Sequence, residues 1–448
     1  MNRRYISKKP EFIIVYGRRR VGKTGLVAQF IKNKPAIFFL AEEKKDMENL
    51  KDMQIEMKNF LNDSEFGLIN FSDWYELFGG FIKRTKRRCI IVIDEFPHLV
   101  EQNSSVPSQF QKIWDMNLGK SNVVLILIGS STGMMEKLPG SKSPLYGRRT
   151  GQLEVKPIPL AEINRFFPKY DMQDIIRVYG CTDSIPLYLV QFSDNDSFYN
   201  NLKNNFLYRD RMLYNEAEIL LKQEFRESAN YFSILKAIAF GYTKNNEIAD
   251  YADIEKSIVS KYLQNLGQIR IIKKEYPVTE RKEKIKSARY VFTDNYFRFW
   301  FRFIYPNRTL IEKGEARAVE EIIKKDYNSY LGIVFEKVSE EFLWKVKPIK
   351  PTKLGRWWHK DKEIDVVALN EQTRDILFAE CKWQDGVNAE KILAELKEKA
   401  KYVEWINDKR KEHYTVFAKS FNKRIKEQEG AKVYCYDLSD MEKVLRKN

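Results

Sequence analysis

The stretch EFIIVYGRRRVGKTGLVAQFI, residues 11–31, constrains the fold of this chain more than any other part of the sequence. An apolar strand is expected first, followed by a loop that begins at Gly17 and ends in Gly22, Lys23 and Thr24, and then by a helical pattern. This is the GxxxxGK[ST] loop in the strand–loop–helix setting that it requires, where backbone N–H groups turn inward around a phosphate. The setting predicts a nucleotide-binding α/β sheet.

The side chains of this loop have separate expected roles. We expect Lys23 to reach the β- and γ-phosphates of a nucleotide and Thr24 to bind Mg²⁺, while the helix N-terminus favours the anion. The other nucleotide-binding positions predicted in the loop are Gly17, Val21, Gly22 and Gly25.

Two further apolar strands end in polar residues. The strand at 89–93 ends in Asp94, which suits the Mg²⁺ shell, and Glu95, which suits polarisation of an attacking water. Helix capping is the alternative role for Asp94. The strand at 123–128 ends in GSSTGMM, where Ser130 or Ser131 would sense the γ-phosphate, because open α/β sheets bind ligands at this edge. A turn role for these serines is the alternative.

The segment SPLYGRRT places Arg148 and Arg149 after a short loop. Either is a candidate arginine finger, acting within the chain or toward a neighbour, and ordinary surface arginines are the alternative. The alternation of strands and helices predicts a parallel, doubly wound sheet over about residues 10–155, in a P-loop domain at 1–156.

A helical lid is expected at 157–225, followed by a winged-helix domain at 226–307 with three helices and a basic two-stranded hairpin. Its second motif helix, at about 254–266, would expose Lys256, Ser257, Ser260 and Lys261 toward DNA, although winged helices also mediate protein contacts. The segment YFRFWFRFIYPN is expected to pack in a core, with stacking of its aromatics on bases as the alternative. Residues 308–325 are predicted to form a charged helical linker.

The remaining residues, 326–448, form a third predicted unit. Asp365 lies on one apolar strand, and Glu380 and Lys382 follow on the next, ILFAECKW. Adjacent antiparallel strands would bring Asp365 beside Glu380, and two carboxylates with a main-chain carbonyl can bind one or two Mg²⁺. Lys382 would then orient a water or stabilise charge at phosphorus, while a structural Glu–Lys ion pair is the alternative. An upstream helix adds Glu336 to the candidate metal ligands.

Composition narrows the choice of partners. The formal net charge is +16, which favours a polyanion such as DNA through phosphate neutralisation, although a solvated basic surface is the plain alternative. The four cysteines are far apart, as in proteins of a reducing compartment. Since no segment approaches about 18 consecutive apolar residues, we expect a cytoplasmic protein with no membrane partner.

The motifs GRRRVGKT, IIVIDEF, GSSTGMM, SPLYGRRT, FWFRFIYPN and GRWWHKDKEIDVVAL…ILFAECKW, in this order, resemble the hallmarks of the archaeal ATPase family. This family is similar to the STAND-like branch of AAA+ proteins and carries a C-terminal domain of unknown function. The resemblance implies ATP and Mg²⁺ as cofactors, and it allows a homo-oligomer. It also implies an α/β restriction-endonuclease-like domain of the PD-(D/E)xK type, with Ile364 in place of the usual proline.

The sequence therefore predicts a Mg²⁺-dependent ATPase that couples ATP binding and hydrolysis to DNA binding and to DNA cleavage by its C-terminal domain. One alternative is an ATP-gated DNA-binding regulator whose nuclease fold is catalytically silent. The other is a STAND-type switch that oligomerises on a protein ligand.

Overall fold

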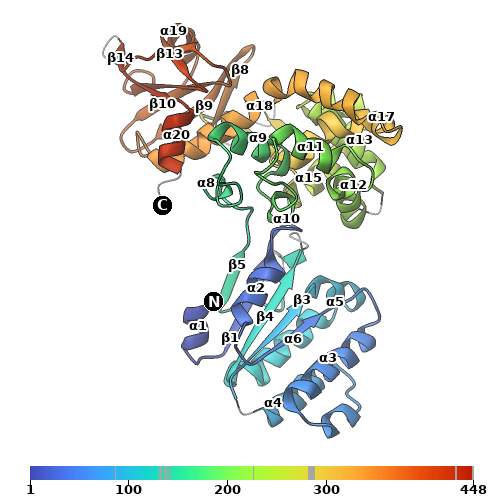
Figure 1. Cartoon of the computed structure of the whole chain (residues 1–448). Helices are drawn as coiled ribbons and strands as arrows, with labels where there is room; N and C mark the ends of the chain where they lie inside the picture. Colours follow the sequence, from blue (N-terminus) through green and yellow to red (C-terminus); the bar gives the residue numbers. More distant parts are fainter. Residues whose placement is uncertain are drawn as a thin grey trace. The chain divides into compact units, whose positions relative to one another are not determined.

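The computed structural model describes residues 1–85, 87–130, 134–135, 138, 140, 143–225, 227–280, 288–428 and 431–445. The chain divides into two compact units, Met1–Pro157 and Ile158–Asn448 (Figure 1). None of the helices in the described part of the chain is long and apolar enough to cross a membrane.

A five-stranded parallel sheet, in the order β2-β3-β4-β1-β5, forms the centre of the first unit. Its strands are β1 (Glu11–Tyr16), β2 (Ala36–Leu40), β3 (Cys89–Asp94), β4 (Val123–Gly129) and β5 (Gly151–Glu154). The strands β1, β3 and β4 are buried along their whole length. This explains their continuous apolar sequences, because a strand covered on both faces has no solvent-facing side.

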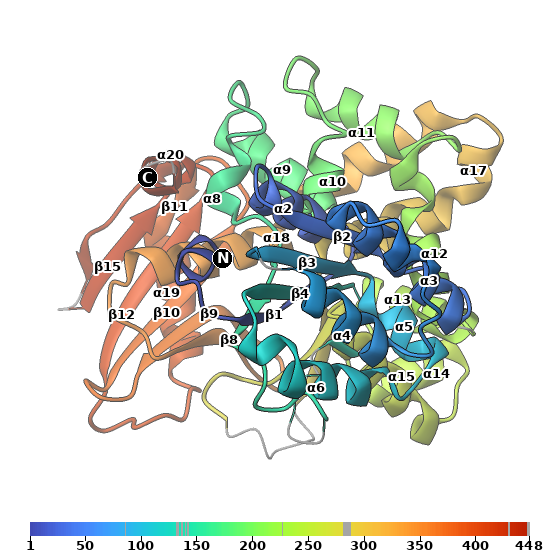
Figure 2. The same ribbon diagram turned by 90° about the horizontal axis from the view of Figure 1, so that it is seen from below.

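Helices cover both faces of this sheet (Figure 2). Ile13 and Val15 of β1 pack with Val27 of α2 (Lys23–Ile31) on one face, where α1 (Asn2–Ile6) also lies. Phe12 and Ile14 pack on the other face with the remaining helices. These are α3 (Asp46–Leu61), α4 (Trp74–Arg84), α5 (Phe96–Gln102) and α6 (Val106–Met116), with single 3₁₀ turns at Glu65–Leu68 and Leu118–Lys120. The predicted doubly wound parallel sheet is confirmed.

The second unit begins with the helices expected over 157–225. They are α8 (Leu160–Ile163), α9 (Met172–Thr182), α10 (Pro186–Leu189), α11 (Phe198–Phe206) and α12 (Met212–Glu224). Three more helices, α13 (Ala229–Ala239), α14 (Asn245–Ala252) and α15 (Lys256–Gln268), pack on one another. An antiparallel hairpin of β6 (Ile272–Glu275) and β7 (Arg289–Phe292) follows them. The basic stretch predicted for this hairpin is 281–289, and residues 281–287 of it lie outside the described residues.

The aromatic segment after the hairpin is part of the core. It forms α16 (Asn295–Phe299), a π-helical turn (Trp300–Ile304), a 3₁₀ turn (Tyr305–Asn307) and α17 (Arg308–Glu312). Tyr296 and Trp300 have no exposed surface, and the indole of Trp300 donates to the carbonyl of Tyr214 at 2.7 Å. The expected core packing is confirmed, because rings buried in this way are not available to stack on bases.

A 31-residue helix, α18 (Ala316–Val346), leads into the C-terminal sheet. The linker predicted at 308–325 would end inside this helix, but α18 continues past residue 325 without a break. The reason is that Val319, Ile323 and Tyr327 continue a buried stripe along the helix. Of the charged residues that suggested a linker, Arg317, Glu321 and Lys325 are exposed, whereas Glu320 is buried and pairs with Lys324.

The C-terminal sheet has six strands in the order β14-β15-β12-β10-β9-β8. They are β8 (Lys353–His359), β9 (Lys362–Asn370), β10 (Asp375–Lys382), β12 (Lys411–Ala418), β14 (Glu427–Gln428) and β15 (Ala431–Tyr436). A small pair, β11 (Val387–Asn388) and β13 (Phe421–Lys423), lies apart from it. The helix α19 (Ala389–Ala400) packs Leu393 against Phe378, while α18 places Phe342 against Phe417 and Tyr436 of the sheet. The last helix is α20 (Leu438–Leu445).

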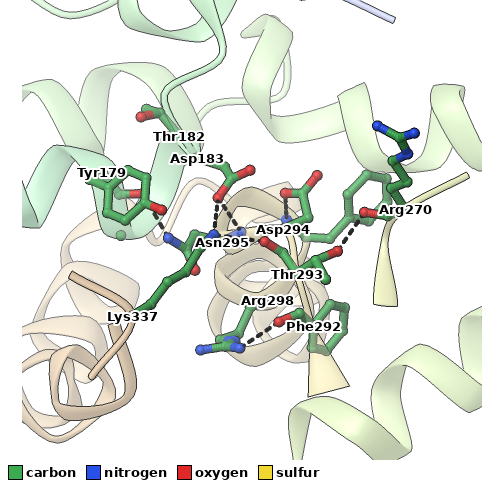
Figure 3. A network of polar contacts seen from close by, with 12 residues as sticks. Tyr179, Thr182, Asp183, Arg270, Phe292, Thr293, Asp294, Asn295, Arg298 and Lys337 are labelled. Atoms are coloured by element: carbon green, nitrogen blue, oxygen red, sulfur yellow. Dashed lines mark hydrogen bonds and ion pairs between the residues drawn. The ribbon is translucent and has the colours of Figure 1, made fainter. Parts of the chain in front are cut away.

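Three segments of the second unit meet at one buried carboxylate (Figure 3). Asp183, directly after α9, accepts hydrogen bonds from the backbone N–H of Asn295 at 3.1 Å and from Nζ of Lys337 at 3.0 Å. Lys337 also donates to the carbonyl of Thr293 at 2.8 Å. Burial is the largest single influence and disfavours the charged amine, but Asp183 and Tyr179 together outweigh it and raise the pKa of Lys337. The network fixes α9, α18 and the start of α16 to one another.

Candidate functional site

The phosphate loop has the backbone geometry that its glycines were expected to permit. A Cβ atom on Gly17 would lie 2.2 Å from the carbonyl oxygen of Val155, so only glycine fits between the end of β1 and the residue after β5. Gly22 has a φ of 89°, in the left-handed region, and it caps the N-terminus of α2. Val21 is buried, and Gly25 lies in the first turn of α2. The two glycines therefore allow the tight turn by which the loop passes from β1 into the N-terminus of α2.

Lys23, Thr24 and Asp94 form the centre of this site. The amine of Lys23 donates to the carbonyls of Gly17 and Arg18, both at 3.0 Å, and so lies inside the loop. The hydroxyl of Thr24, in the first turn of α2, donates to Asp94 Oδ2 at the end of β3 at 2.7 Å. Burial raises the pKa of Asp94, although Thr24 opposes the shift. A hydroxyl beside a buried carboxylate is a donor set that fits Mg²⁺, since the ion prefers oxygen ligands and would offset this burial.

Glu95 and Ser130 lie next to one another at the same sheet edge. Glu95 has a φ of 50°, and its carboxylate accepts the hydroxyl of Ser130 at 2.6 Å. This contact is possible because β3 and β4 are neighbouring parallel strands and end at the same edge of the sheet. Glu95 thus connects the end of β3 with the end of β4, where a water and a γ-phosphate would meet. Ser131, the other candidate sensor, lies outside the described residues.

Arg148, one of the two candidate arginine fingers, has several contacts within the first unit. Arg148 makes a bidentate contact with Asp115, with distances of 2.8–3.1 Å, and also donates to the carbonyls of Pro144 and Tyr146. These contacts fasten its own loop to the end of α6, which is the structural role named as the alternative. Arg149, the next residue, is half-buried.

The second predicted site lies where β9 and β10 separate. These strands are antiparallel, and Val366 pairs with Ala379, so the next residues along each strand are Asp365 and Glu380. Asp365 Oδ2 accepts the backbone N–H of Cys381 at 2.8 Å. Burial, followed by the negative charge of Glu380, raises the pKa of Asp365. The structure therefore brings this pair of carboxylates together.

Two lysines neutralise Glu380 in this arrangement. Its carboxylate is 7% exposed and accepts Lys382 Nζ at 2.8 Å and Lys399 Nζ at 2.9 Å. Lys399 comes from α19 and was not anticipated from the sequence. The available signal was its place in the last turn of the helix that follows the ExK strand, close to the buried Leu396 and Ala400.

Glu336 joins this region from α18 through a different partner. It contacts Arg356 Nη2 of β8 at 3.3 Å, and Arg356 also pairs with Glu363. Burial is the largest cause that raises the pKa of Glu336, with Arg356 opposing it and Asp365 adding to it. Among the described residues, no three His, Cys, Asp or Glu side chains are grouped closely enough to hold one metal ion. Within the predicted metal site, Glu380 pairs with Lys382 and Lys399, whereas Glu336 pairs with Arg356. The two carboxylates therefore face different cations and not a common centre.

The helix α15 presents the polar face that was expected for DNA. Lys256, Ser257, Ser260 and Lys261 are all exposed. The hairpin beside it is less available, because Arg289 of β7 pairs with Glu363 of β9 at 3.0 Å and lies over the ring of Trp358. The base of the hairpin is thus held against the C-terminal sheet.

The first unit has the architecture of a P-loop ATPase domain, with the phosphate loop after β1, Asp94 and Glu95 after β3, and Ser130 after the strand between them. The whole chain belongs to the family that joins an ATPase domain, predominantly from Archaea, to a C-terminal domain of archaeal and bacterial proteins of unknown function. The models of these two domains match residues 1–192 and 300–417.

One relative extends along almost the full chain, and others match parts of it. The uncharacterized protein MJECL04 of Methanocaldococcus jannaschii is 38% identical and aligns with 98% of this chain and 97% of its own length. A second protein of that organism, the uncharacterized protein MJ0424, is 38% identical over 16% of this chain and 67% of its own length. The Walker-type ATPase PABY2304 of Pyrococcus abyssi is a solved structure with the same fold, at a TM-score of 0.51 and 22% identity over 67% of this chain and 93% of that one. The expected archaeal ATPase with a C-terminal domain of unknown function is confirmed.

Proposed function

We propose that this protein is a Mg²⁺-dependent ATPase whose nucleotide state controls how its second unit engages DNA. The observation that carries the proposal is the convergence of Thr24, Asp94, Glu95 and Ser130 at the edge of the sheet that holds the phosphate loop. Lys23 and the N-terminus of α2 bind the phosphates, and Thr24 and Asp94 hold the ion. Bound Mg²⁺ supplies neutralisation of the phosphate charge.

The chain's own residues then account for hydrolysis. Glu95 accepts a proton from the attacking water and orients it, and Ser130 fixes the Glu95 carboxylate and senses whether a γ-phosphate is present. Both Arg148 and Arg149 are candidates for stabilising transferred charge, and Arg148 would first have to leave Asp115 and the two carbonyls that it contacts.

DNA is the polyanion that we assign to the second unit. Support comes from the net charge of +16 and from α13–α15 followed by a two-stranded hairpin, the order of elements in a winged helix. Lys256 and Lys261 are exposed on the helix that would face DNA. Replacing both with glutamate is expected to weaken DNA binding at least tenfold and to flatten its salt dependence, as measured by fluorescence anisotropy. Unchanged affinity and salt dependence would exclude this face.

We also propose that the C-terminal domain cleaves DNA at Asp365, Glu380 and Lys382. Support comes from the facing carboxylates on β9 and β10 and from the amine two residues after Glu380. The two carboxylates are hard oxygen donors that suit Mg²⁺, and a bound ion would supply a water of lowered pKa. Lys382 would be released from Glu380 to stabilise charge at phosphorus, and Lys399 would keep Glu380 in place.

A cleavage assay on the full chain tests this second step. Asp365→Asn is expected to abolish Mg²⁺-dependent cleavage of plasmid and branched DNA while ATP hydrolysis continues. The matched control is Asp361→Asn, which alters an exposed carboxylate in the turn before β9 and should cleave at the wild-type rate. Equal cleavage by the two variants would refute the proposed nuclease site.

A catalytically silent C-terminal fold is the second candidate function. The observation that favours it is the pairing of Glu380 with both Lys382 and Lys399, which already neutralise the carboxylate that a metal ion would need. In that case the protein is an ATP-gated DNA-binding regulator. Calorimetric titration with Mn²⁺ separates the two, since the regulator would show the same metal binding in the wild type and in Asp365→Asn.

A further inference from the structure

The second unit contains a cavity of about 360 Å³ that neither the ATPase site nor the candidate nuclease site uses. It lies between the end of α13, β7, the segment after α16, α18 and β8. The side chains that matter most on its wall are Phe240, Tyr290, Arg298, Arg302, Ile333 and Arg356. The volume lies at the lower end of the ~300–1,000 Å³ that small-molecule sites occupy, so it suits one compact molecule.

One wall of this cavity is cationic. Arg298 and Arg302 lie four residues apart in the aromatic segment, and Arg356 lies on β8. Arg298 donates Nη2 to the carbonyl of Phe292 at 2.8 Å, while its buried Nη1 has no hydrogen-bond partner among the described residues. The buried Nε of Arg356 also has no hydrogen-bond partner among the residues that the structure describes. Buried N–H donors without partners are costly, so a ligand that accepts from these two guanidinium groups would be bound favourably once the side chains turn toward it.

Arg302 adds a third guanidinium with a different kind of contact. Its guanidinium lies 5.3 Å from the centroid of the Phe240 ring. Asp326 is an acid on the cavity wall, and Arg356 already pairs with Glu336 and Glu363, so the surplus positive charge of the wall comes from Arg298 and Arg302. The remaining positive charge selects an anion, and planar guanidinium groups bind phosphate or carboxylate through paired hydrogen bonds.

Another part of the wall is apolar and accessible. Phe240 is 41% exposed and Ile333 is 45% exposed, although both are large apolar side chains that would normally be buried. Tyr290 of β7 adds a second ring to this wall. A bare phosphate ion would leave these surfaces uncovered, and a neutral ring compound would leave the arginines unpaired. A ligand that satisfies both walls carries an anionic group and a flat apolar group.

We propose that this cavity binds a nucleotide unit, with its phosphate on Arg298, Arg302 and Arg356 and its base against Phe240 and Tyr290. The unit comes either from a free mononucleotide or from the phosphorylated end of a DNA strand, which present the same chemistry. Guanidinium forks match phosphate oxygens, and aromatic rings stack on any base.

Arg356 links this cavity to the candidate nuclease site, so binding of a phosphate would affect that site. A neighbouring cavity of about 300 Å³ shares Arg298 and Arg356 with the first and is also lined by Glu336 and Asp365. A phosphate on Arg356 would compete with Glu336 for the same guanidinium and so change the charge beside Asp365. This consequence rests on the proposed nuclease function, whereas the binding itself does not.

Binding measured on the full-length Lys23→Ala variant tests the proposal, because this variant lacks the lysine of the phosphate loop. Calorimetry would use four probes: AMP, adenosine, inorganic phosphate and a 5′-phosphorylated oligonucleotide. We expect AMP or the oligonucleotide to bind at least tenfold more tightly than adenosine and phosphate. Binding by AMP identifies a free nucleotide as the source, and binding by the oligonucleotide alone identifies a strand end.

Substitutions in the same background assign the binding to this cavity. Arg302→Gln should weaken the binding at least tenfold, and Arg317→Gln, at an exposed arginine near the start of α18, should leave it within twofold. Thermal melting of both variants checks that they fold, and Arg302→Lys should restore part of the affinity if charge is what binds. The proposal is overturned if neither nucleotide probe binds at millimolar concentration or if Arg302→Gln binds like Arg317→Gln. Neither outcome depends on DNA cleavage.

Discussion

Replacing Asp183 with asparagine tests how the second unit is held together where α9, α16 and α18 meet. The substitution keeps the shape of the side chain and an oxygen that accepts from Asn295 and Lys337, and it removes only the negative charge. Asparagine also tolerates the left-handed backbone at this position, where φ is 50°. Any loss of stability therefore reports the charge and not a change in shape.

The expected loss follows from two hydrogen bonds and their burial. Hydrogen bonds to charged groups contribute about 1.5–3 kcal/mol and neutral ones about 0.5–1.5 kcal/mol, so each bond loses roughly 1–1.5 kcal/mol. Asp183 is 7% exposed, but the side chain of Lys337 is 36% exposed, so solvent screening reduces the second contribution. We therefore expect Asp183→Asn to lower the free energy of unfolding by about 2 kcal/mol, or the melting temperature by roughly 4–8 °C.

Differential scanning calorimetry of the full chain measures this loss in the transition that ATP does not shift. Glu321→Gln is the control, because Glu321 is 72% exposed and pairs with Lys324 on the same helix, where an ion pair contributes about 0.5 kcal/mol or less. The double variant Asp183→Asn with Lys337→Met should lose less unfolding free energy than the two single variants lose together. The reason is that each single variant leaves the other partner buried without its opposite charge. Melting of Asp183→Asn within 1 °C of the control, or additive losses, would refute the reasoning.

Three further substitutions have expected outcomes. Glu95→Gln should lower the kcat of ATP hydrolysis about 100-fold or more while the Kd for ATP stays within threefold, and an unchanged kcat would remove Glu95 from catalysis. Gly17→Ala should weaken ATP binding at least tenfold in a fluorescent-nucleotide titration, because its Cβ would collide with the carbonyl of Val155; wild-type affinity would show that the loop can move aside. Gly332→Ala should stabilise the chain by about 0.5–1 kcal/mol, since its Cβ meets no atom within 4 Å inside α18, and a lower melting temperature would contradict this.

Sequence patterns were most informative where they were local. The strands β1, β3 and β4 were predicted because each is a continuous apolar run that ends in a polar motif. The strands β2 and β5 were not assigned, because Ala36–Leu40 carries no motif at its end and Gly151–Glu154 is short and half polar. Their place in the sheet depends on pairing with β3 and β1, which a local pattern does not reveal.

The candidate site in the C-terminal domain shows the same limit. The facing positions of Asp365 and Glu380 followed from strand alternation and the short connection between two strands. The second cation on Glu380, Lys399, did not follow, because it reaches the site from another helix. The same holds for Arg356, whose partners Glu336 and Glu363 lie on separate elements. Charge composition was also misleading at 308–325, where a buried stripe continues α18 through an apparent linker.

The coupling between nucleotide state and DNA is tested most directly by the affinity for DNA at fixed salt, with ATP and without nucleotide. Anisotropy titrations would compare Glu95→Gln, in which bound ATP persists, with Lys23→Ala and with Lys32→Ala, an exposed lysine just beyond the end of α2. The account predicts that ATP changes the Kd for DNA at least tenfold in Glu95→Gln and Lys32→Ala and has no effect in Lys23→Ala. The same Kd with and without ATP in all three would contradict it.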